Sequence, residues 1–220
     1  MSSAPDFVLY GYFRSSAAFR VRIAFNLKGI VPELRFVHLL KGGGEQHRAE
    51  YGAVNPQELI PTLVHDGHAI CQSLAIIEYL DEIVPEPPLL PGDAAGRARV
   101  RQIAQSIACD IHPLNNLRVN FWLRDHLHAS EELRLEWQQH WMSLGFAALE
   151  KLLAHSPQTG TLCHGDAPSL ADICLIPQLA NARRVHLDLS PYPALLRIEE
   201  HALALRAFDA ALPKNQPDAE

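Results

Sequence analysis

The stretch that decides the fold reads Phe13-Arg14-Ser15-Ser16-Ala17-Ala18-Phe19-Arg20-Val21-Arg22. A short apolar run precedes it, and an apolar-periodic segment follows as far as Lys28-Gly29, where a glycine is a common helix stop. Two adjacent hydroxyls therefore stand at the start of a predicted helix, where backbone N–H groups lack partners. Such a place suits an anion, including a thiolate, although a serine there can also act only as the helix cap.

The chain around this stretch alternates strand and helix patterns. Asp66-Gly67 marks the tight turn of a hairpin. Ser73 begins a helix with one apolar face, and Lys41–Gly44, with its three glycines, predicts a flexible segment with little order. In chain order the predicted elements are a strand at 7–12, a helix at 17–28, a strand at 34–39, hairpin strands at 61–65 and 68–72, and a helix from 73.

Beyond a proline-rich run at 84–92 the strand patterns nearly vanish. Pro113 is predicted to interrupt a helix, and Ser130 to cap a long one. Ser169–Asp172 forms a capping box with Asp where Glu or Gln is usual. The polar tail from 213 is predicted to be loose. We therefore predict a small α/β domain at 1–84, a linker at 85–96 and an all-helical domain at 97–220.

Composition excludes several classes of protein. The net charge of −6 argues against nucleic acid or an anionic membrane as a partner. No apolar run reaches spanning length, and residues 1–6 lack the pattern of a secretion signal. The widely spaced cysteines form no C-x-x-C motif, which predicts no metal site and buried free thiols in a reducing cytoplasm. They are Cys71, Cys109, Cys163 and Cys174.

Several motifs together resemble the zeta class of the glutathione transferase superfamily, which includes maleylacetoacetate isomerases and bacterial maleylpyruvate isomerases. Ser15–Ala24 is similar to the class signature Ser-Ser-Cys-x-Trp-Arg-Val-Arg-Ile-Ala. The similar stretches cover nearly the whole chain, and the others are Asn55-Pro56, Ile60–Leu63, Gln72–Leu80, Asp110–Arg118, Gly165-Asp166, Ser169–Asp172, Pro177-Gln178, Asn181–Arg184 and Gln216–Asp218.

This resemblance implies a thioredoxin-like N-terminal domain, an all-helical C-terminal domain and a homodimer, with a cis peptide before Pro61. It also implies glutathione as the cofactor. Gln72 and Ser73 would then bind its γ-glutamyl end, and a helix start at Ser73 favours a carboxylate on physical grounds, although a plain N-cap is an alternative. Backbone groups of Ile60 would meet the cysteinyl part, and Gln46 the glycine end.

The same resemblance implies two further contacts to glutathione, from two residues next to a predicted helix break. An equal alternative is that these two residues are only a polar pair that stabilises the break. They are His112 and Asn116.

Ser15 is the predicted partner of the glutathione thiolate, with Ser16 as the alternative donor. A free thiol has a pKa of about 8.5. Lowering that pKa by one unit needs about 1.4 kcal/mol, which a hydrogen bond to a charged group can supply. Ala17 departs from the class pattern, which has cysteine there. Reactions through a mixed disulfide with that cysteine, such as reductive dehalogenation, would lose their nucleophile, whereas isomerisation uses the sulfur of glutathione.

Maleyl substrates carry two carboxylates, and the fork of arginine binds carboxylates in bidentate fashion. Arg14 adjoins the serines, and Arg118 and Arg184 match positions near the substrate in related isomerases. Arg20 and Arg22 are expected to serve surface or structural ion pairs. We leave Arg183 out of the predicted site.

These residues together predict a glutathione-dependent cis–trans isomerase that converts maleylacetoacetate to the fumaryl product. Maleylpyruvate is the alternative substrate. A general transferase acting on α-halo acids or other electrophiles would keep Ser15 but would not need the arginines. A non-catalytic module that merely keeps the fold is the remaining alternative, and the presence of Ser15, Gln72 and Ser73 argues against it.

Overall fold

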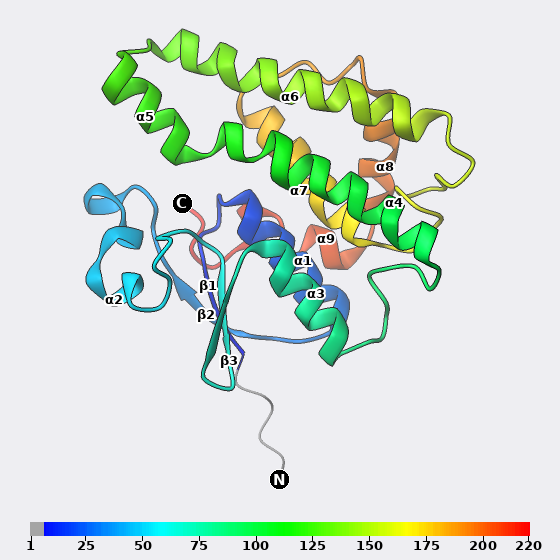
Figure 1. Cartoon of the computed structure of the whole chain (residues 1–220), viewed down its shortest axis with the longest axis horizontal. Coiled ribbons are helices and arrows are strands. Elements are labelled where there is room, and N and C mark those ends of the chain that lie inside the picture. The colour runs from blue at the N-terminus through cyan, green and yellow to red at the C-terminus, as the bar shows by residue number, and fades with distance from the viewer. Residues whose placement is uncertain (1–6) are drawn as a thin grey trace. The chain divides into compact units, whose positions relative to one another are not determined.

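The computed structural model describes residues 7–220 (Figure 1), so the predicted absence of a secretion signal in residues 1–6 lies outside the described part. The chain divides into two compact units, Met1–Pro88 with Leu205–Glu220, and Leu89–Ala204. The C-terminal segment therefore packs with the N-terminal unit, which differs from the predicted helical domain at 97–220. Each unit is described by itself.

The first unit is built on a four-stranded sheet in the order β2-β1-β3-β4. β1 and β2 are parallel, as a β-α-β crossover requires, and the other neighbouring pairs are antiparallel. Leu9 on β1 lies opposite Leu63 on β3, and both are buried in the core. The strands are β1 (Val8–Gly11), β2 (Glu33–Phe36), β3 (Thr62–His65) and β4 (His68–Cys71), which confirms the predicted strands to within a few residues.

Two helices, α1 (Ser16–Lys28) and α3 (Ser73–Ile83), pack against each other in this unit (Figure 1). Gly29 ends α1 in the left-handed conformation with φ 67°, as the helix stop predicts. The peptide bond between Ile60 and Pro61 is cis, as the resemblance implies. The unit is thus thioredoxin-like.

The predicted flexible segment around the three glycines is instead ordered. It forms two 3₁₀ turns, Lys41–Gly43 and Glu45–His47, followed by the short helix α2 (Ala49–Gly52). His38 fixes the first turn, since its Nδ1 accepts from the N–H groups of Leu40 and Lys41. Glycine composition alone overestimated the freedom of this segment because it does not show such side-chain anchors.

The second unit is helical. A π-helical segment, Ser106–Ile111, and a 3₁₀ turn, Pro113–Asn115, separate its first two helices, so the interruption at Pro113 is confirmed, and the regular α-helix already ends at Gln105. The helices of this unit are α4 (Ala94–Gln105), α5 (Leu117–Leu127), α6 (Glu131–Ala154), α7 (Leu170–Arg184) and α8 (Pro193–Leu203), and the short α9 (Arg206–Asp209) belongs to the first unit.

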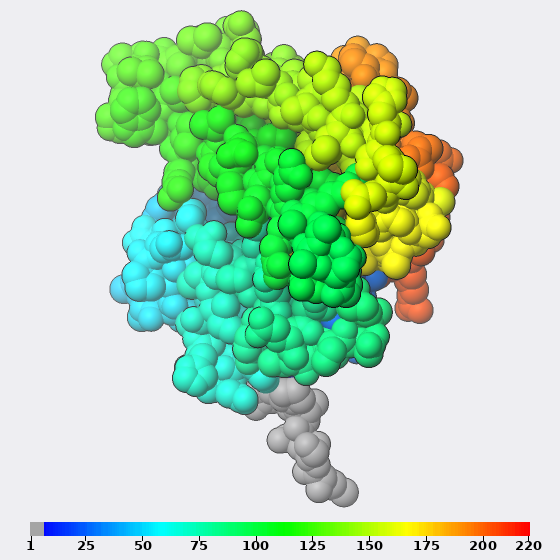
Figure 2. All heavy atoms as spheres, turned by 45° about the vertical axis from the view of Figure 1, so that its right-hand side comes forward, coloured from blue at the N-terminus to red at the C-terminus, as the bar shows by residue number. Residues whose placement is uncertain are grey.

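The capping box at the start of α7 is present as predicted. The carboxylate of Asp172 is 0 % exposed and accepts from the N–H groups of Ser169 and Cys163 and from the Ser169 hydroxyl. Arg99 on α4 donates to Cys163 O and Thr159 Oγ1, and Figure 2 shows α4 (green) and the loop at 155–169 (yellow) side by side. These contacts tie the loop to two helices.

The cysteines are all free, but their burial differs from the prediction. Cys163 and Cys174 are buried, Cys71 is half-buried and Cys109 is exposed on the π-helical segment. Burial raises the pKa of the Cys163 thiol well above its ordinary value, which makes that thiol unreactive. Within residues 7–220, no helix combines the length and apolar character needed to cross a bilayer, and no cluster of His, Cys, Asp or Glu is arranged to hold a metal ion.

Gly145 on α6 lets the π-helical segment approach closely. A Cβ at this position would lie 2.3 Å from Ile111 Cδ1. We expect Gly145→Ala to lower the free energy of unfolding by about 1–2 kcal/mol, because overpacking outweighs the better helix propensity of alanine. Gly52→Ala is the matched control, since a Cβ there meets nothing within 4 Å. Urea unfolding of both variants measures the difference, and an unchanged or more stable Gly145→Ala variant would contradict this packing.

Candidate active site

Ser15 closes a tight turn and caps α1 at the same time. Its N–H donates to Tyr12 O at 3.0 Å, and its Oγ accepts from the Ala18 N–H at 3.1 Å. The cap uses the hydroxyl as an acceptor only, so the hydroxyl proton stays available to donate to an anion. Ser15 is half-buried, as is Ser16, the first residue of α1. The two roles weighed for this serine, helix cap and anion donor, are therefore compatible.

Arg14 adds a positive charge to the same turn. Its side chain is exposed, whereas the neighbouring Tyr12 is buried. Burial raises the pKa of Tyr12, and Arg14 opposes this rise through its charge and a hydrogen bond. Tyr12 Oη also lies 3.4 Å from His38 Nε2. The turn thus combines an anion donor with a solvent-accessible cation.

The start of α3 carries backbone strain at a polar residue. Gln72 has φ 73° and ψ 118°, a conformation rare for a residue with a side chain, and such strain of about 1–3 kcal/mol gathers at functional sites. Gln72 Nε2 donates to Gln57 Oε1 at 3.0 Å. Gln72 occupies the N-cap position and makes no side-chain capping bond, so the plain N-cap alternative for Ser73 is wrong: Ser73 is the first helical residue.

The Ser73 hydroxyl accepts a hydrogen bond from a buried arginine. Arg20 is 1 % exposed, and its Nη1 donates to Ser73 Oγ at 3.3 Å. The Ser73 hydroxyl therefore accepts from the protein and keeps its own proton for a ligand. Arg20 and Arg22 are both buried, so of the two expected roles, surface or structural ion pairs, the surface role is wrong for both. Residues two positions apart point to opposite sides of a helix, and both arginines are buried because α1 is surrounded on all sides from Ala18 to Phe25.

Gln46 is buried and fixed, in contrast to its predicted flexible setting. Its Nε2 lies 3.0 Å from His47 Nε2, and His47 Nδ1 lies 2.5 Å from Glu58 Oε2. Gly44, with φ 104°, leaves room for the amide, because a Cβ there would lie 2.5 Å from Gln46 Nε2. The Gln46 Oε1 atom is buried and has no hydrogen-bond partner. Ile60 is half-buried and forms the cis peptide bond with Pro61 just before β3 begins.

The second unit carries the other predicted residues. His112 lies at the junction of the π-helical segment and the 3₁₀ turn. Asn116 caps α5, and its Oδ1 accepts from the Arg118 N–H at 3.0 Å, so the expectation that His112 and Asn116 share one helix face is wrong: they belong to different elements. Arg118 is exposed in the first turn of α5. The structural alternative for Asn116, a polar residue at a helix break, is thus one of its roles.

Arg184 and Arg183 end α7 with different surroundings. The exposed Arg184 donates through Nη2 to Asn181 Oδ1. Arg183 forms a forked ion pair with Glu199, in which Nη2 lies 2.5 Å from Oε2. This pairing occupies Arg183 and agrees with its exclusion from the predicted site.

The comparisons with known proteins identify the family. The profile described as "Glutathione S-transferase, N-terminal domain" matches residues 9–88, and the profile for the C-terminal domain matches residues 136–201. A probable maleylacetoacetate isomerase of Vibrio cholerae is 51 % identical over 212 residues, which cover 96 % of this chain and 98 % of that protein. The chain belongs to the glutathione transferase family.

Two solved structures are similar to the chain over nearly its whole length, and the first of them places it in the zeta class. The holo structure of maleylpyruvate isomerase, a bacterial zeta-class glutathione transferase, has a TM-score of 0.94 and 45 % identity, and the match covers 97 % of this chain and all of that one. The structure of maleylacetoacetate isomerase from Methylobacterium extorquens AM1 with bound malonate and glutathione has a TM-score of 0.93 and 43 % identity, covering 97 % and 99 %. The resemblance predicted from the motifs is confirmed.

In this glutathione transferase, the turn from Tyr12 to Ser15, called the serine turn below, is fixed by contacts that no sequence motif predicts. Arg22 is 8 % exposed, and its guanidinium donates to the backbone oxygens of Tyr12, Phe13 and Ala211. Burial lowers the pKa of Arg22 to about 10, an effect that the nearby Asp218 opposes. Tyr12 and Phe13 lie 10 and 9 residues from Arg22, and Ala211 lies 189 residues away, so no pattern within a helix or a turn marks these contacts.

Proposed function

We propose that this protein is a glutathione-dependent cis–trans isomerase of maleyl keto-acids, with maleylacetoacetate as the first substrate. One observation carries the proposal: the half-buried hydroxyl of Ser15 accepts from its own helix and keeps its proton free to donate. A donor fixed in this way, at the N-terminus of a helix, stabilises a sulfur anion more than a thiol.

Three features of the first unit support glutathione as the ligand. The buried Gln46 Oε1 atom lacks a partner, and a peptide N–H would satisfy it. The strained Gln72 and the uncapped start of α3 favour a carboxylate, as the γ-glutamyl end offers. The Ser73 hydroxyl, held as an acceptor by Arg20, can donate to the same carboxylate.

When bound, glutathione supplies a sulfur nucleophile that adds to the cis double bond and leaves after the resulting single bond has rotated. Ser15, with Ser16 as the alternative, keeps that sulfur ionised by donating a hydrogen bond. Arg14, Arg118 and Arg184 bind the substrate carboxylates and stabilise the negative charge that develops next to the keto group. His112 and Asn116 remain proposed contacts to glutathione. All of these residue roles rest on the resemblance and on the local geometry of each unit.

Maleylpyruvate remains the second candidate, because the holo structure with TM-score 0.94 is that of a maleylpyruvate isomerase. Reductive dehalogenation of α-halo acids is disfavoured by Ala17, which offers no thiol for a mixed disulfide. A homodimer is proposed from the zeta-class family. A cytoplasmic location is proposed from the four unpaired cysteines.

Catalytic use of glutathione tests the proposal. We expect the absorbance of maleylacetoacetate to disappear completely with substoichiometric glutathione, because isomerisation returns the thiol unchanged. Parallel kinetics with maleylpyruvate rank the two substrates by kcat/KM. A requirement for one glutathione per substrate would indicate conjugation and would overturn the isomerase function.

A further inference from the structure

The polar tail, predicted to be loose, is instead anchored to the serine turn. Asp218 Oδ2 accepts from the Phe13 N–H at 2.9 Å, across 205 residues of sequence. Farther along the tail, Glu220 Oε1 lies 2.8 Å from Lys41 Nζ and 3.3 Å from His38 Nε2. Chain termini are usually poorly ordered, but this tail is ordered because a hydrogen bond to the Phe13 backbone and the ion pairs of Glu220 fix it to the first unit.

The anchor takes a donor that the turn itself does not use. Tyr12 O accepts from the Ser15 N–H across the turn, and the Phe13 N–H donates to Asp218 instead of to a carbonyl of the turn. Arg22 holds the turn from the other side, with Nη2 3.1 Å from Phe13 O and 3.1 Å from Ala211 O. The turn is therefore fixed at its N–H by Asp218 and at its carbonyls by Arg22, which is itself bonded to the C-terminal segment.

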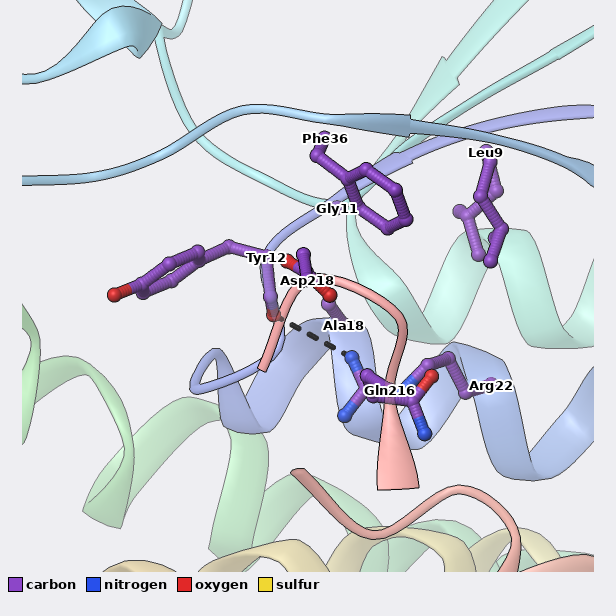
Figure 3. A pocket seen from close by; sticks show the side chains of 9 residues that line it. Leu9, Gly11, Tyr12, Ala18, Arg22, Phe36, Gln216 and Asp218 are labelled. Atoms are coloured by element: carbon purple, nitrogen blue, oxygen red, sulfur yellow. Dashed lines mark hydrogen bonds between the residues drawn. The ribbon is translucent and has the colours of Figure 1, made fainter. Parts of the chain in front are cut away.

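Figure 3 shows part of this arrangement, with Asp218 beside Tyr12 and the dashed bond from Arg22 to Tyr12 O. Asp218 and Gln216, with residues of the sheet and of α1, line a partly open hollow of about 10 Å³, which is room for about one water molecule. A space of this size excludes a substrate. The carboxylate of Asp218 acts on the backbone of the turn and not on a ligand in this hollow.

We propose that Asp218 is a positioning residue, whose carboxylate fixes the turn at Phe13 so that the Ser15 hydroxyl stays aimed at the sulfur of glutathione. This inference rests on the proposed function. A displacement of about 1 Å at a reacting group can lower the rate on the order of 10²-fold. A hydrogen bond to Phe13, two residues from Ser15, can therefore change the rate by shifting the Ser15 hydroxyl. A charged acceptor also binds an N–H more strongly than a neutral one.

Three variants test this role. Asp218→Ala removes the acceptor, Asp218→Asn keeps an oxygen of the same shape without the charge, and Glu220→Gln is the matched control that changes a tail carboxylate bonded elsewhere. The first measurement is hydrogen exchange of the Phe13 amide, which needs no ligand. We expect exchange about tenfold or more faster in Asp218→Ala, an intermediate rate in Asp218→Asn and no change in Glu220→Gln.

The second measurement is the pKa of the bound glutathione thiol, from thiolate absorbance against pH. We expect it to rise by about half a unit to one unit in Asp218→Ala, with about a tenfold loss in kcat/KM at neutral pH and partial rescue in Asp218→Asn. If Asp218→Ala does not fold, Asp218→Asn carries both measurements. An unchanged Phe13 exchange rate, or an unchanged thiol pKa in a variant that still binds glutathione, would overturn the role of Asp218. Wild-type protein that binds no glutathione would instead overturn the proposed function and, with it, this inference.

Discussion

Replacement of Ser15 by alanine is expected to lower kcat/KM for isomerisation by about 10²-fold or more, because removing one aimed donor to a reacting anion costs about 10²–10³-fold. The same change should raise the pKa of the bound thiol, so the loss should shrink as the pH rises through that pKa. Loss of the bond to the Ala18 N–H should also cost about 1 kcal/mol of stability. Steady-state kinetics against pH and thiolate absorbance measure the two functional effects.

Ser130→Ala is the matched control for the structural part of this change. Ser130 caps α6 through a 3.2 Å bond from the Leu133 N–H and has no role in the proposed site. It should lose a similar amount of stability and keep full activity. If the large loss appeared in Ser16→Ala and not in Ser15→Ala, the thiolate donor would be Ser16. If neither variant lost activity, the serine turn would have no part in catalysis.

Joint replacement of Arg14, Arg118 and Arg184 by alanine is expected to lower kcat/KM by about 10³-fold or more. Each hydrogen bond to a charged group contributes about 1.5–3 kcal/mol, and a dicarboxylate needs several of them. All three side chains are exposed, so their loss should leave the free energy of unfolding nearly unchanged. Kinetics on the single, double and triple variants, with urea unfolding of each, measure both effects.

Arg124→Ala is the control for the loss of positive charge. Arg124 lies on α5, as Arg118 does, but its guanidinium is paired with Asp125 at 2.6 Å on the exposed surface. It should keep normal activity. Full isomerase activity in the triple variant would contradict the assignment of these arginines to the substrate and would favour a general transferase.

Local patterns predicted the elements that carry the first unit. The Asp66-Gly67 turn has φ values of 49° and 77°, as a tight hairpin turn requires, and the helix at 16–28 begins and ends where its cap residues indicate. These features depend on residues within one or two turns of each other. The capping box at Ser169 is of the same kind, because both of its bonds lie within four residues.

The candidate site was only partly readable in the same way. Ser15 and Ser73 stand next to recognisable helix starts, whereas the fixed amide of Gln46 depends on His47, Glu58 and the conformation of Gly44. Composition around the three glycines indicated flexibility, since the pattern of residues does not reveal how a short turn is anchored by side chains. The sequence left a surface and a structural role open for Arg20 and Arg22, because charged residues are rarely buried unless the fold supplies their partners.

The amino-acid sequence by itself determined the order of strands and helices, the cap at Ser15 and the family. Each of these depends on neighbouring residues or on short motifs that can be recognised without the structure. Only the tertiary structure decided that the tail returns to the first unit and that Asp218 bonds the turn at Phe13, a contact across 205 residues. The physical reason is that such a contact depends on where the whole fold brings two distant segments, and neither segment carries a local signal of the other.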